Sequence, residues 1–275
     1  MRFSIPYSNS NSSEAPVWGP ITSPLKYVVP DYVVTVYIAE FINALTSLIY
    51  LGYAFHRLHS VSTYAEAFTT ALPYVGLAYV GICSAAYHTL LKAPAELADE
   101  LSMHFATACV LHRIFSFDQP PRIALRNGIV LLSILIGFVG TQSIKQDFLW
   151  HALLWASMLA AIGWKTRNVV QKNFKKGDPA KRRATKVARL GGVYFGVGYA
   201  IWNLDWLFCS QLTSLKRQWG MPWSFLLEFH GWWHLLTAMG AYSFMALVEL
   251  LVDQNKPKQE RGQPFAWPVS LYLSH

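Results

Sequence analysis

Residues 223–252 read WSFLLEFHGWWHLLTAMGAYSFMALVELLV, an apolar run that is long enough to cross a bilayer as a helix. Two ionisable residues, His230 and His234, lie inside it, four positions apart. On a helix this spacing places both imidazoles on one face, one turn from each other. Ionisable side chains within a membrane are costly and usually have a function. We interpret the pair as metal ligands; the alternative is a pair of hydrogen-bonded core histidines.

The composition of the whole chain is that of an integral membrane protein. Of its 275 residues, 53% are hydrophobic and 14% are charged, whereas soluble domains have about 25% charged residues. The net charge of +8 comes from loops between apolar runs, which favours anionic headgroups over nucleic acid as its partner. The three cysteines lack CxxC spacing, so they predict neither a disulfide framework nor a thiolate metal site.

The apolar runs predict an all-α, seven-transmembrane-helix bundle in one domain, residues 33–252. A polar N-terminal segment, residues 1–32, precedes the bundle and has no signal-peptide pattern; a tail, residues 253–275, follows it. The predicted spans cover residues 33–55, 67–91, 97–117, 124–141, 147–164, 188–209 and 223–252.

Basic residues predict the orientation of these spans. The lysine- and arginine-rich loop 165–187 falls on the same side as Arg57, Arg113 and Lys256. Because cytosolic loops are enriched in Lys and Arg, we expect a lumenal N-terminus and a cytosolic C-terminus. The glycosylation sequon at Asn11 agrees with this orientation.

The predicted topology brings the polar residues of the spans to one depth. All of them fall in the lumenal half of the bundle, which scattered solvated residues would have no reason to do. We therefore predict that they form one site. The set comprises Glu40, Asn43, Ser84, His88, Asp99, Asn203, Asp205, His230 and His234.

Three of these residues suit a catalytic zinc ion. His88, His230 and His234 would supply three nitrogen ligands and leave the fourth position for water, which zinc activates as a nucleophile. Asp99 could take a proton from this water and pass it to a leaving amine, and Ser84 could stabilise an oxyanion. The alternatives are ordinary: Ser84 bonding a backbone carbonyl of its own helix, and Asp99 capping a helix start.

We assign structural roles, not catalytic ones, to the other histidines and to three residues near His230. We interpret five histidines as interfacial or hydrogen-bonded, and Glu228, Trp232 and Trp233 as packing or capping residues. The five histidines are His56, His59, His104, His112 and His151.

At these positions the sequence resembles the alkaline ceramidase family, within a seven-helix superfamily that includes the adiponectin receptors. The resemblance implies a zinc-dependent amidase that cleaves the N-acyl bond of ceramide, with zinc on His88, His230 and His234 and with Ser84 and Asp99 beside it. It also implies an endoplasmic reticulum or Golgi membrane. The matching stretches are Trp18-Gly19-Pro20-Ile21-Thr22-Ser23, Tyr37-Ile38-Ala39-Glu40-Phe41-Ile42-Asn43, Ser84-Ala85-Ala86-Tyr87-His88, Asp99-Glu100-Leu101, Trp202-Asn203-Leu204-Asp205 and Phe229–His234.

One segment departs from the family pattern. The family usually builds a calcium site from a segment that reads Asp-Trp-Cys-Glu-Glu-Asn-Tyr, plus the glutamate of the first span. Here residues 26–32 read KYVVPDY, so Lys26 and Val29 replace two carboxylates. Calcium takes six to eight oxygen ligands, and the degenerate site retains few: Glu40, Asn43, Asp31 and Tyr27. We expect the Lys26 ammonium to replace the ion as the partner of Glu40, which puts the need for calcium in doubt.

A receptor and a transporter are the two alternatives to a lipid amidase. A seven-helix receptor, or an inactive relative, could keep the zinc site without turnover, but a receptor should have a longer signalling tail than residues 253–275. A transporter should show broken helices or repeats, and neither is evident. The sequence therefore favours an enzyme acting on a lipid in the bilayer, with no nucleic acid and no obligate protein partner.

Overall fold

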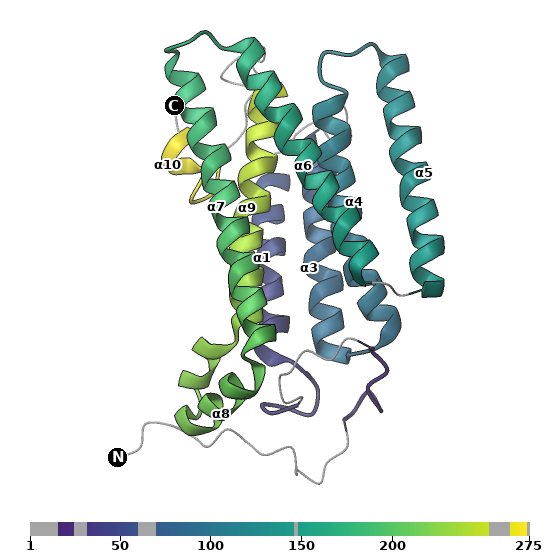
Figure 1. Cartoon of the computed structure of the whole chain (residues 1–275), viewed down its shortest axis with the longest axis vertical. Helices are drawn as coiled ribbons and strands as arrows, with labels where there is room; N and C mark the ends of the chain where they lie inside the picture. The colour runs from purple at the N-terminus through teal and green to yellow at the C-terminus, as the bar shows by residue number, and fades with distance from the viewer. Residues whose placement is uncertain (1–15, 25–31, 60–69, 146–147, 253–264, 274–275) are drawn as a thin grey trace.

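The computed structural model describes residues 16–24, 32–59, 70–145, 148–252 and 265–273. Long helices run side by side along its long axis (Figure 1). In the described residues we find helices, turns and one isolated bridge, Thr35 to Ile38, but no sheet. The all-helical class is therefore confirmed. The helices are α1 (Phe41–Leu58), α3 (Leu72–Leu90), α4 (Ala93–Phe115), α5 (Pro121–Lys145), α6 (Phe148–Asn173), α7 (Pro179–Leu207), α8 (Cys209–Trp219), η2 (Trp223–Leu227), α9 (Phe229–Val252) and α10 (Ser270–Leu273).

Each predicted span overlaps one long helix, but residues 223–252 are not a single helix: the 3-10 helix η2 covers Trp223–Leu227, and α9 begins after Glu228. The other differences lie in length. Helices α6 and α7 reach residues 173 and 179, beyond the predicted limits 164 and 188. They extend because helical hydrogen bonding continues through basic turns that lie outside the apolar stretch. Two helices, Pro121–Ile144 and Phe229–Val252, are long and apolar enough by composition to cross a membrane. The number of spans thus stays a prediction.

Helix α9 is central in the bundle. It packs against α1 and α7, and α1 packs in turn against α3. Helix α4 contacts α3, α5 and α6, while α5 forms one edge of the molecule (Figure 1). The chain direction places the starts of α1, α4, α6 and α9 and the ends of α3, α5 and α7 at the end where α8 lies (Figure 1). We call this the α8 end.

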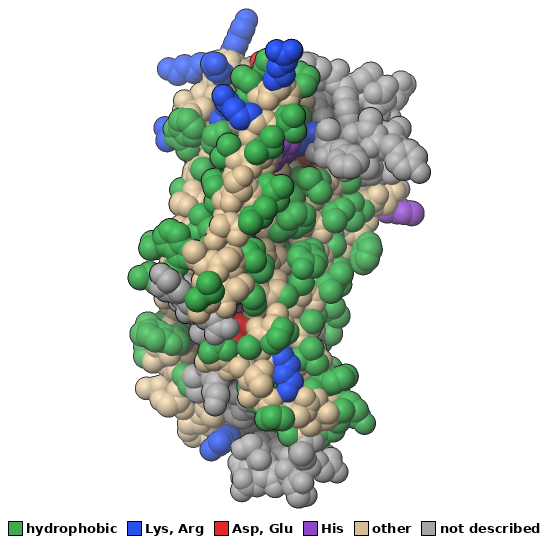
Figure 2. Space-filling model, turned by 90° about the vertical axis from the view of Figure 1, so that its right-hand side faces the viewer, with side chains coloured by type: hydrophobic (Ala, Val, Ile, Leu, Met, Phe, Trp, Pro, Cys, Tyr) green, Lys and Arg blue, Asp and Glu red, His purple; other side chains and the backbone are tan. Residues whose placement is uncertain are grey.

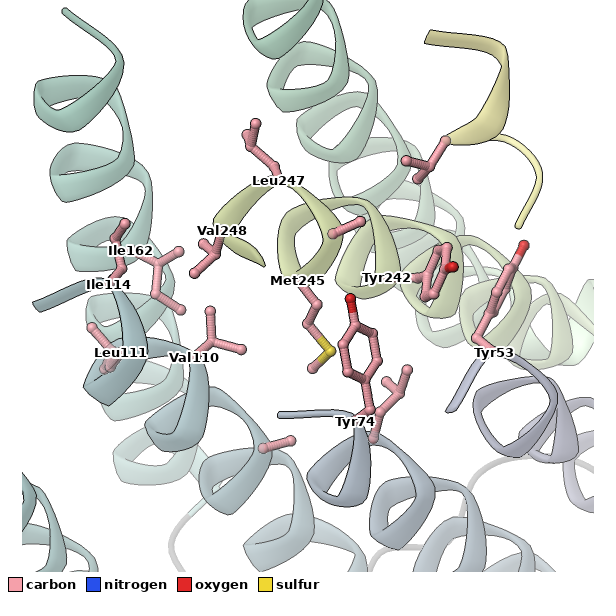
Figure 3. Packing of buried hydrophobic residues seen from close by; sticks show 14 of the residues in the cluster. Tyr53, Tyr74, Val110, Leu111, Ile114, Ile162, Tyr242, Met245, Leu247 and Val248 are labelled. Atoms are coloured by element: carbon pink, nitrogen blue, oxygen red, sulfur yellow. The ribbon is translucent and has the colours of Figure 1, made fainter. Parts of the chain in front are cut away.

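Aromatic and aliphatic residues fill the opposite half of the bundle. The ring of Tyr242 stacks on Tyr53 at a centroid distance of 4.6 Å and lies 6.1 Å from the ring of Tyr74. Tyr74 and Met245 point toward one another from α3 and α9 (Figure 3). The Tyr74 hydroxyl donates to Glu249 (2.8 Å), which also forms a buried ion pair with Arg57. This cluster joins α1, α3 and α9 at the end away from α8.

Glycines let α9 approach its two neighbours closely. A Cβ atom built on Gly231 would lie 2.9 Å from Ile42 Cγ2 of α1, and one on Gly240 would lie 2.8 Å from Phe195 Cδ2 of α7. Small residues at helix contacts of this kind are typical of membrane proteins, where close packing replaces the hydrophobic drive between helices. Side chains of α1 and α7 therefore pack directly against the glycines of α9 on two sides.

The surface separates by chemistry along the long axis. Hydrophobic side chains cover the middle of the face in Figure 2, and lysines and arginines gather at the end away from α8. Exposed apolar residues are numerous on α5, for example Ile129, Leu132 and Ile136. A bilayer-embedded bundle has this distribution.

Candidate active site

Three histidines meet at the α8 end of the bundle. His88 is in the last turn of α3, and His230 and His234 are in the first turns of α9. Their ring centroids are 4.6–5.0 Å apart, and one ligating atom from each lies within 4.8 Å of the others. All three are at most 4% exposed. The i, i+4 spacing on α9 and the antiparallel neighbour α3 together produce this cluster.

Glu40 sets the orientation of His88. The backbone N–H of Glu40 donates to the His88 carbonyl (2.9 Å), which ties the start of α1 to the end of α3. The Glu40 carboxylate then accepts from His88 Nδ1 at 2.5 Å and from Asn43 Nδ2 at 2.9 Å. Because a carboxylate accepts only, the proton is on Nδ1, and the lone pair of the imidazole is on Nε2.

Helix α1 orients His234 in the same way. His234 Nδ1 lies 3.1 Å from the carbonyl of Asn43 and 3.1 and 3.3 Å from the hydroxyls of Thr46 and Ser47. A carbonyl can only accept, so Nδ1 donates and Nε2 again carries the lone pair. One turn of α1 therefore prepares two of the three histidines.

The arrangement fits a metal ion such as zinc. Three buried imidazoles in mutual contact cannot all be protonated without strong repulsion, and a metal ion takes neutral imidazole nitrogens. A carboxylate or carbonyl on the other ring nitrogen is the usual support of a metal-bound histidine. His88, with Glu40, and His234, with the Asn43 carbonyl, both have this support.

Ser84 and Asp99 lie beside the histidines. Ser84, one turn before His88, is 2.9 Å from the Ser47 hydroxyl and hydrogen-bonds the Asp99 carboxyl across the α3–α4 contact. Ser84 thus has side-chain partners on two other helices. Of the other polar residues expected here, Asn203 donates to the Tyr199 carbonyl in α7, and neither it nor Asp205 lines the cavity described next.

A cavity of about 120 Å³ opens onto His230, His234, Ser84 and Asp99. A second, apolar cavity of about 330 Å³ continues from it between α3, α4, α6, α7 and α9. Five residues line both, so the two spaces are adjacent: Tyr50, Val80, Met103, Trp155 and Trp233. Trp233, interpreted from sequence as a packing residue, therefore also forms part of the cavity wall.

The start of α9 is held by an ion pair that the sequence did not indicate. Lys216 Nζ of α8 lies 2.8 Å from Glu228 Oε2, and both side chains are buried. Glu228 directly precedes α9, and its carbonyl accepts from the Gly231 N–H (3.0 Å). This pair anchors the turn that presents His230.

The expected calcium segment lies largely outside the described residues. This applies to Lys26, Tyr27, Val29 and Asp31. Within the described chain, Glu40 Oε1 and Asn43 Oδ1 are buried oxygens without a hydrogen-bond partner, and Lys216 is within electrostatic reach of Glu40. Two such oxygens are far fewer than the six to eight that calcium takes.

Two histidines form a contact that the sequence did not indicate. His104 and His151 are 0% and 5% exposed, and their ring centroids lie 4.8 Å apart. His104 Nδ1 lies 3.0 Å from the Glu100 carbonyl. The sequence indicated hydrogen bonding or an interfacial position; it did not indicate that the two meet, because their contact depends on how α4 crosses α6. His112, by contrast, is hydrogen-bonded to the Ala124 carbonyl (3.1 Å) as expected.

The fold and the site define a class of protein: a helical bundle with a buried three-histidine cluster that could bind a metal, beside a cavity that is polar at one end and apolar at the other. A comparison with protein families is more specific. The ceramidase family model matches residues 19–274. The chain therefore belongs to the ceramidase family, whose members are hydrolases.

Curated relatives agree with this assignment. The chain is 30% identical to the alkaline ceramidase YPC1 of Saccharomyces cerevisiae over 258 residues, which cover 87% of this chain and 80% of the relative. It is 26% identical to alkaline ceramidase 3 of Mus musculus over 227 residues, which cover 82% of each chain. The similarity to the alkaline ceramidase of Drosophila melanogaster is 20% over 268 residues, covering 92% of this chain and 86% of the relative.

Proposed function

We propose that this protein is a zinc-dependent intramembrane amidase that hydrolyses the N-acyl bond of ceramides, giving a sphingoid base and a fatty acid. One observation carries the proposal: two members of the three-histidine cluster, His230 and His234, line a cavity together with Ser84 and Asp99, and this cavity continues into an apolar one. Membership of the ceramidase family and the names of the relatives support the same reaction.

The two adjacent cavities suit the shape of a ceramide. Its amide and hydroxyl groups are polar and compact, and its two chains are hydrocarbon. The cavity at the histidines offers polar groups, while the adjoining space is lined by side chains such as Leu77, Val110 and Phe244. A chain that enters this space from the bilayer moves from one hydrocarbon environment to another, so the apolar lining accommodates it at little cost and leaves the amide at the polar end.

His88, His230 and His234 would hold the zinc ion, and Glu40 and the Asn43 carbonyl would keep two of these rings in place. When bound, zinc supplies a Lewis acid that polarises a carbonyl and activates water. Neutral imidazoles are the form that the hydrogen bonds of His88 and His234 select.

Asp99 moves the proton in this scheme. It takes a proton from the attacking water as the water oxygen bonds the acyl carbon, and it gives this proton to the amide nitrogen as the C–N bond breaks. The products are a free fatty acid and the amine of the base. The hydrogen bond from Ser84 keeps the Asp99 carboxyl at the cavity wall.

Ser84 acts on the substrate oxygen. Its hydroxyl bonds the Asp99 carboxylate at first. Once Asp99 has taken up the proton of the water, the Ser84 hydroxyl is free to donate to the oxygen of the amide as negative charge develops there. Ser47, 2.9 Å away, holds the Ser84 hydroxyl in position.

We place the protein in the endoplasmic reticulum or Golgi membrane, with the N-terminus lumenal, seven helices spanning the bilayer and the tail at residues 253–275 cytosolic. The basic residues between the helices and the apolar middle of the surface support this placement (Figure 2). The active site would then lie in the lumenal half of the membrane, near the depth at which the amide of a ceramide sits.

The test is release of sphingoid base from a ceramide panel by detergent-purified protein, measured by mass spectrometry with and without a zinc chelator. We expect release that needs both zinc and His230, and one zinc per chain that is lost in His230→Ala. His56→Ala is the matched control, because His56 is exposed and lies in the last turn of α1, away from the site. Stoichiometric zinc without release from any ceramide would contradict the amidase and favour the receptor alternative.

A further inference from the structure

A second polar group lines the active-site cavity on the side of α4 and α6. Glu100 and His151 contribute to the wall of the 120 Å³ cavity, together with Asp99, His230 and His234. The side chains of His151 and Glu100 are 6% and 13% exposed. The proposed hydrolysis uses Asp99 and the three clustered histidines, and it gives Glu100 and His151 no part.

The Glu100 carboxylate is held rigidly at this wall. Its Oε2 accepts from Gln142 Nε2 of α5 at 3.0 Å and lies 4.0 Å from His151 Nδ1 of α6. His104 packs behind the pair, 4.8 Å from the His151 ring and 4.3 Å from the ring of Phe138. The carboxylate and the imidazole thus come from different helices and converge at the cavity.

Helix association alone does not account for this placement. Polar groups that join helices in a membrane can lie anywhere along the contact, and Gln142 and His104 do so without lining the cavity. A carboxylate that faces a cavity inside a membrane bundle is costly unless a polar group meets it. Glu100 and His151 are the members of this network that face that space.

We propose that Glu100 and His151 bind a hydroxyl group of the sphingoid base and so determine which ceramides are cleaved; this assignment rests on the proposed amidase function. An ionised carboxylate only accepts hydrogen bonds, and a hydroxyl donates one. Imidazole can accept or donate, so it complements the same hydroxyl. The two hydroxyls common to ceramides are on the carbons that flank the one bearing the amide nitrogen, and the Glu100–His151 pair lies in the cavity where that amide is cleaved.

The negative charge of Glu100 also selects against substrates with an anionic headgroup. A ceramide that carries a phosphate in place of its primary hydroxyl would bring negative charge beside this carboxylate, and like charges repel strongly at low dielectric constant. The site therefore selects a neutral, hydroxylated headgroup and excludes an anionic one.

The experiment measures kcat/KM for ceramides that differ by one polar group: ceramide, phytoceramide, 1-deoxyceramide and ceramide 1-phosphate. Wild type is compared with Glu100→Gln and His151→Phe. We expect wild type to prefer a hydroxylated substrate by at least about tenfold over the analogue that lacks the bound hydroxyl. Both variants should reduce this ratio to within about threefold, mainly by slowing the hydroxylated substrate. Glu100→Gln should also raise the rate on ceramide 1-phosphate.

His104→Gln is the matched control, because His104 belongs to the same network but does not line the cavity. It should keep the wild-type preference even where the total rate falls. The zinc content of each variant shows whether its site has folded. If one of Glu100→Gln and His151→Phe fails to fold, the other is sufficient for the test. An equal loss on every substrate in both variants would overturn the assignment and leave the amidase standing. Wild type without turnover of any ceramide would overturn both.

Discussion

Two of the three histidines of the candidate metal site, His88 and His234, are oriented by neighbours on α1. Glu40 and the Asn43 carbonyl accept hydrogen bonds from the Nδ1 atoms of His88 and His234 and leave both lone pairs on Nε2. A histidine without such a partner could rotate or change tautomer, and it would bind a metal less tightly. The affinity of the site therefore depends on residues that do not themselves belong to the three-histidine cluster.

This dependence can be measured with Glu40→Gln. We expect zinc affinity to fall about 10- to 100-fold, because a neutral amide supports His88 more weakly than a carboxylate does. Competition with a chromophoric chelator in calcium-free buffer measures the change and separates it from any effect of calcium. Glu96→Gln is the control: Glu96 is buried near the same end but accepts from Ser23 (2.5 Å). Equal zinc affinity in both variants would show that Glu40 does not support the site.

The candidate site could be predicted from the sequence where the spacing of two residues along a helix places their side chains on the same face. His230 and His234 are a turn apart on one helix, Ser84 and His88 are likewise, and the alternation of spans brings both pairs to one depth. The Lys216–Glu228 pair and the meeting of His104 with His151 were not predictable. They depend on crossings of helices that no spacing in the sequence encodes.

At the scale of elements, α9 is the helix on which the site depends. It carries two of the three histidines and is confined between α1 and α7 by contacts at Gly231 and Gly240. Gly231 lies between His230 and His234, so this close contact of α9 with α1 is at the candidate metal site itself. Stability and metal binding are therefore coupled at this residue.

Gly231→Ala tests the coupling. A methyl group there meets Ile42 Cγ2 at 2.9 Å, and overpacking of this kind costs about 1–3 kcal/mol. We expect a lower midpoint of thermal unfolding in detergent together with a loss of bound zinc. Gly137→Ala is the control, since a Cβ there meets nothing within 4 Å and alanine favours the helix by about 1 kcal/mol. An unchanged midpoint and zinc content in Gly231→Ala would contradict the close contact.

The helix lengths show the limit of sequence prediction at this scale. Apolar runs indicated where each helix lies, because burial in lipid or protein requires apolar side chains. They could not indicate that α6 and α7 continue into basic turns, since a charged turn beyond the apolar stretch stays helical through its backbone hydrogen bonds.

For the whole molecule, the apolar middle and the charged end predict how the chain is oriented in a membrane (Figure 2). Loops rich in lysine and arginine stay cytosolic, so a tag at residue 275 should be cleaved by protease added to intact microsomes. A tag at residue 1 should be cleaved only after detergent is added, and the protein should resist extraction with alkaline carbonate. A soluble lumenal marker controls for vesicle integrity. Simultaneous cleavage of both tags in intact vesicles would rule out an odd number of spans.

The cavity has two walls that come from different parts of the bundle. Helices α3 and α9 present Ser84, His230 and His234, whereas α4 and α6 present Glu100 and His151, which Gln142 of α5 supports from behind. The two sets of contacts share no side chain. Under the proposed function, substitutions at Glu100 and His151 can therefore change which lipid fits the cavity and leave the three-histidine cluster untouched.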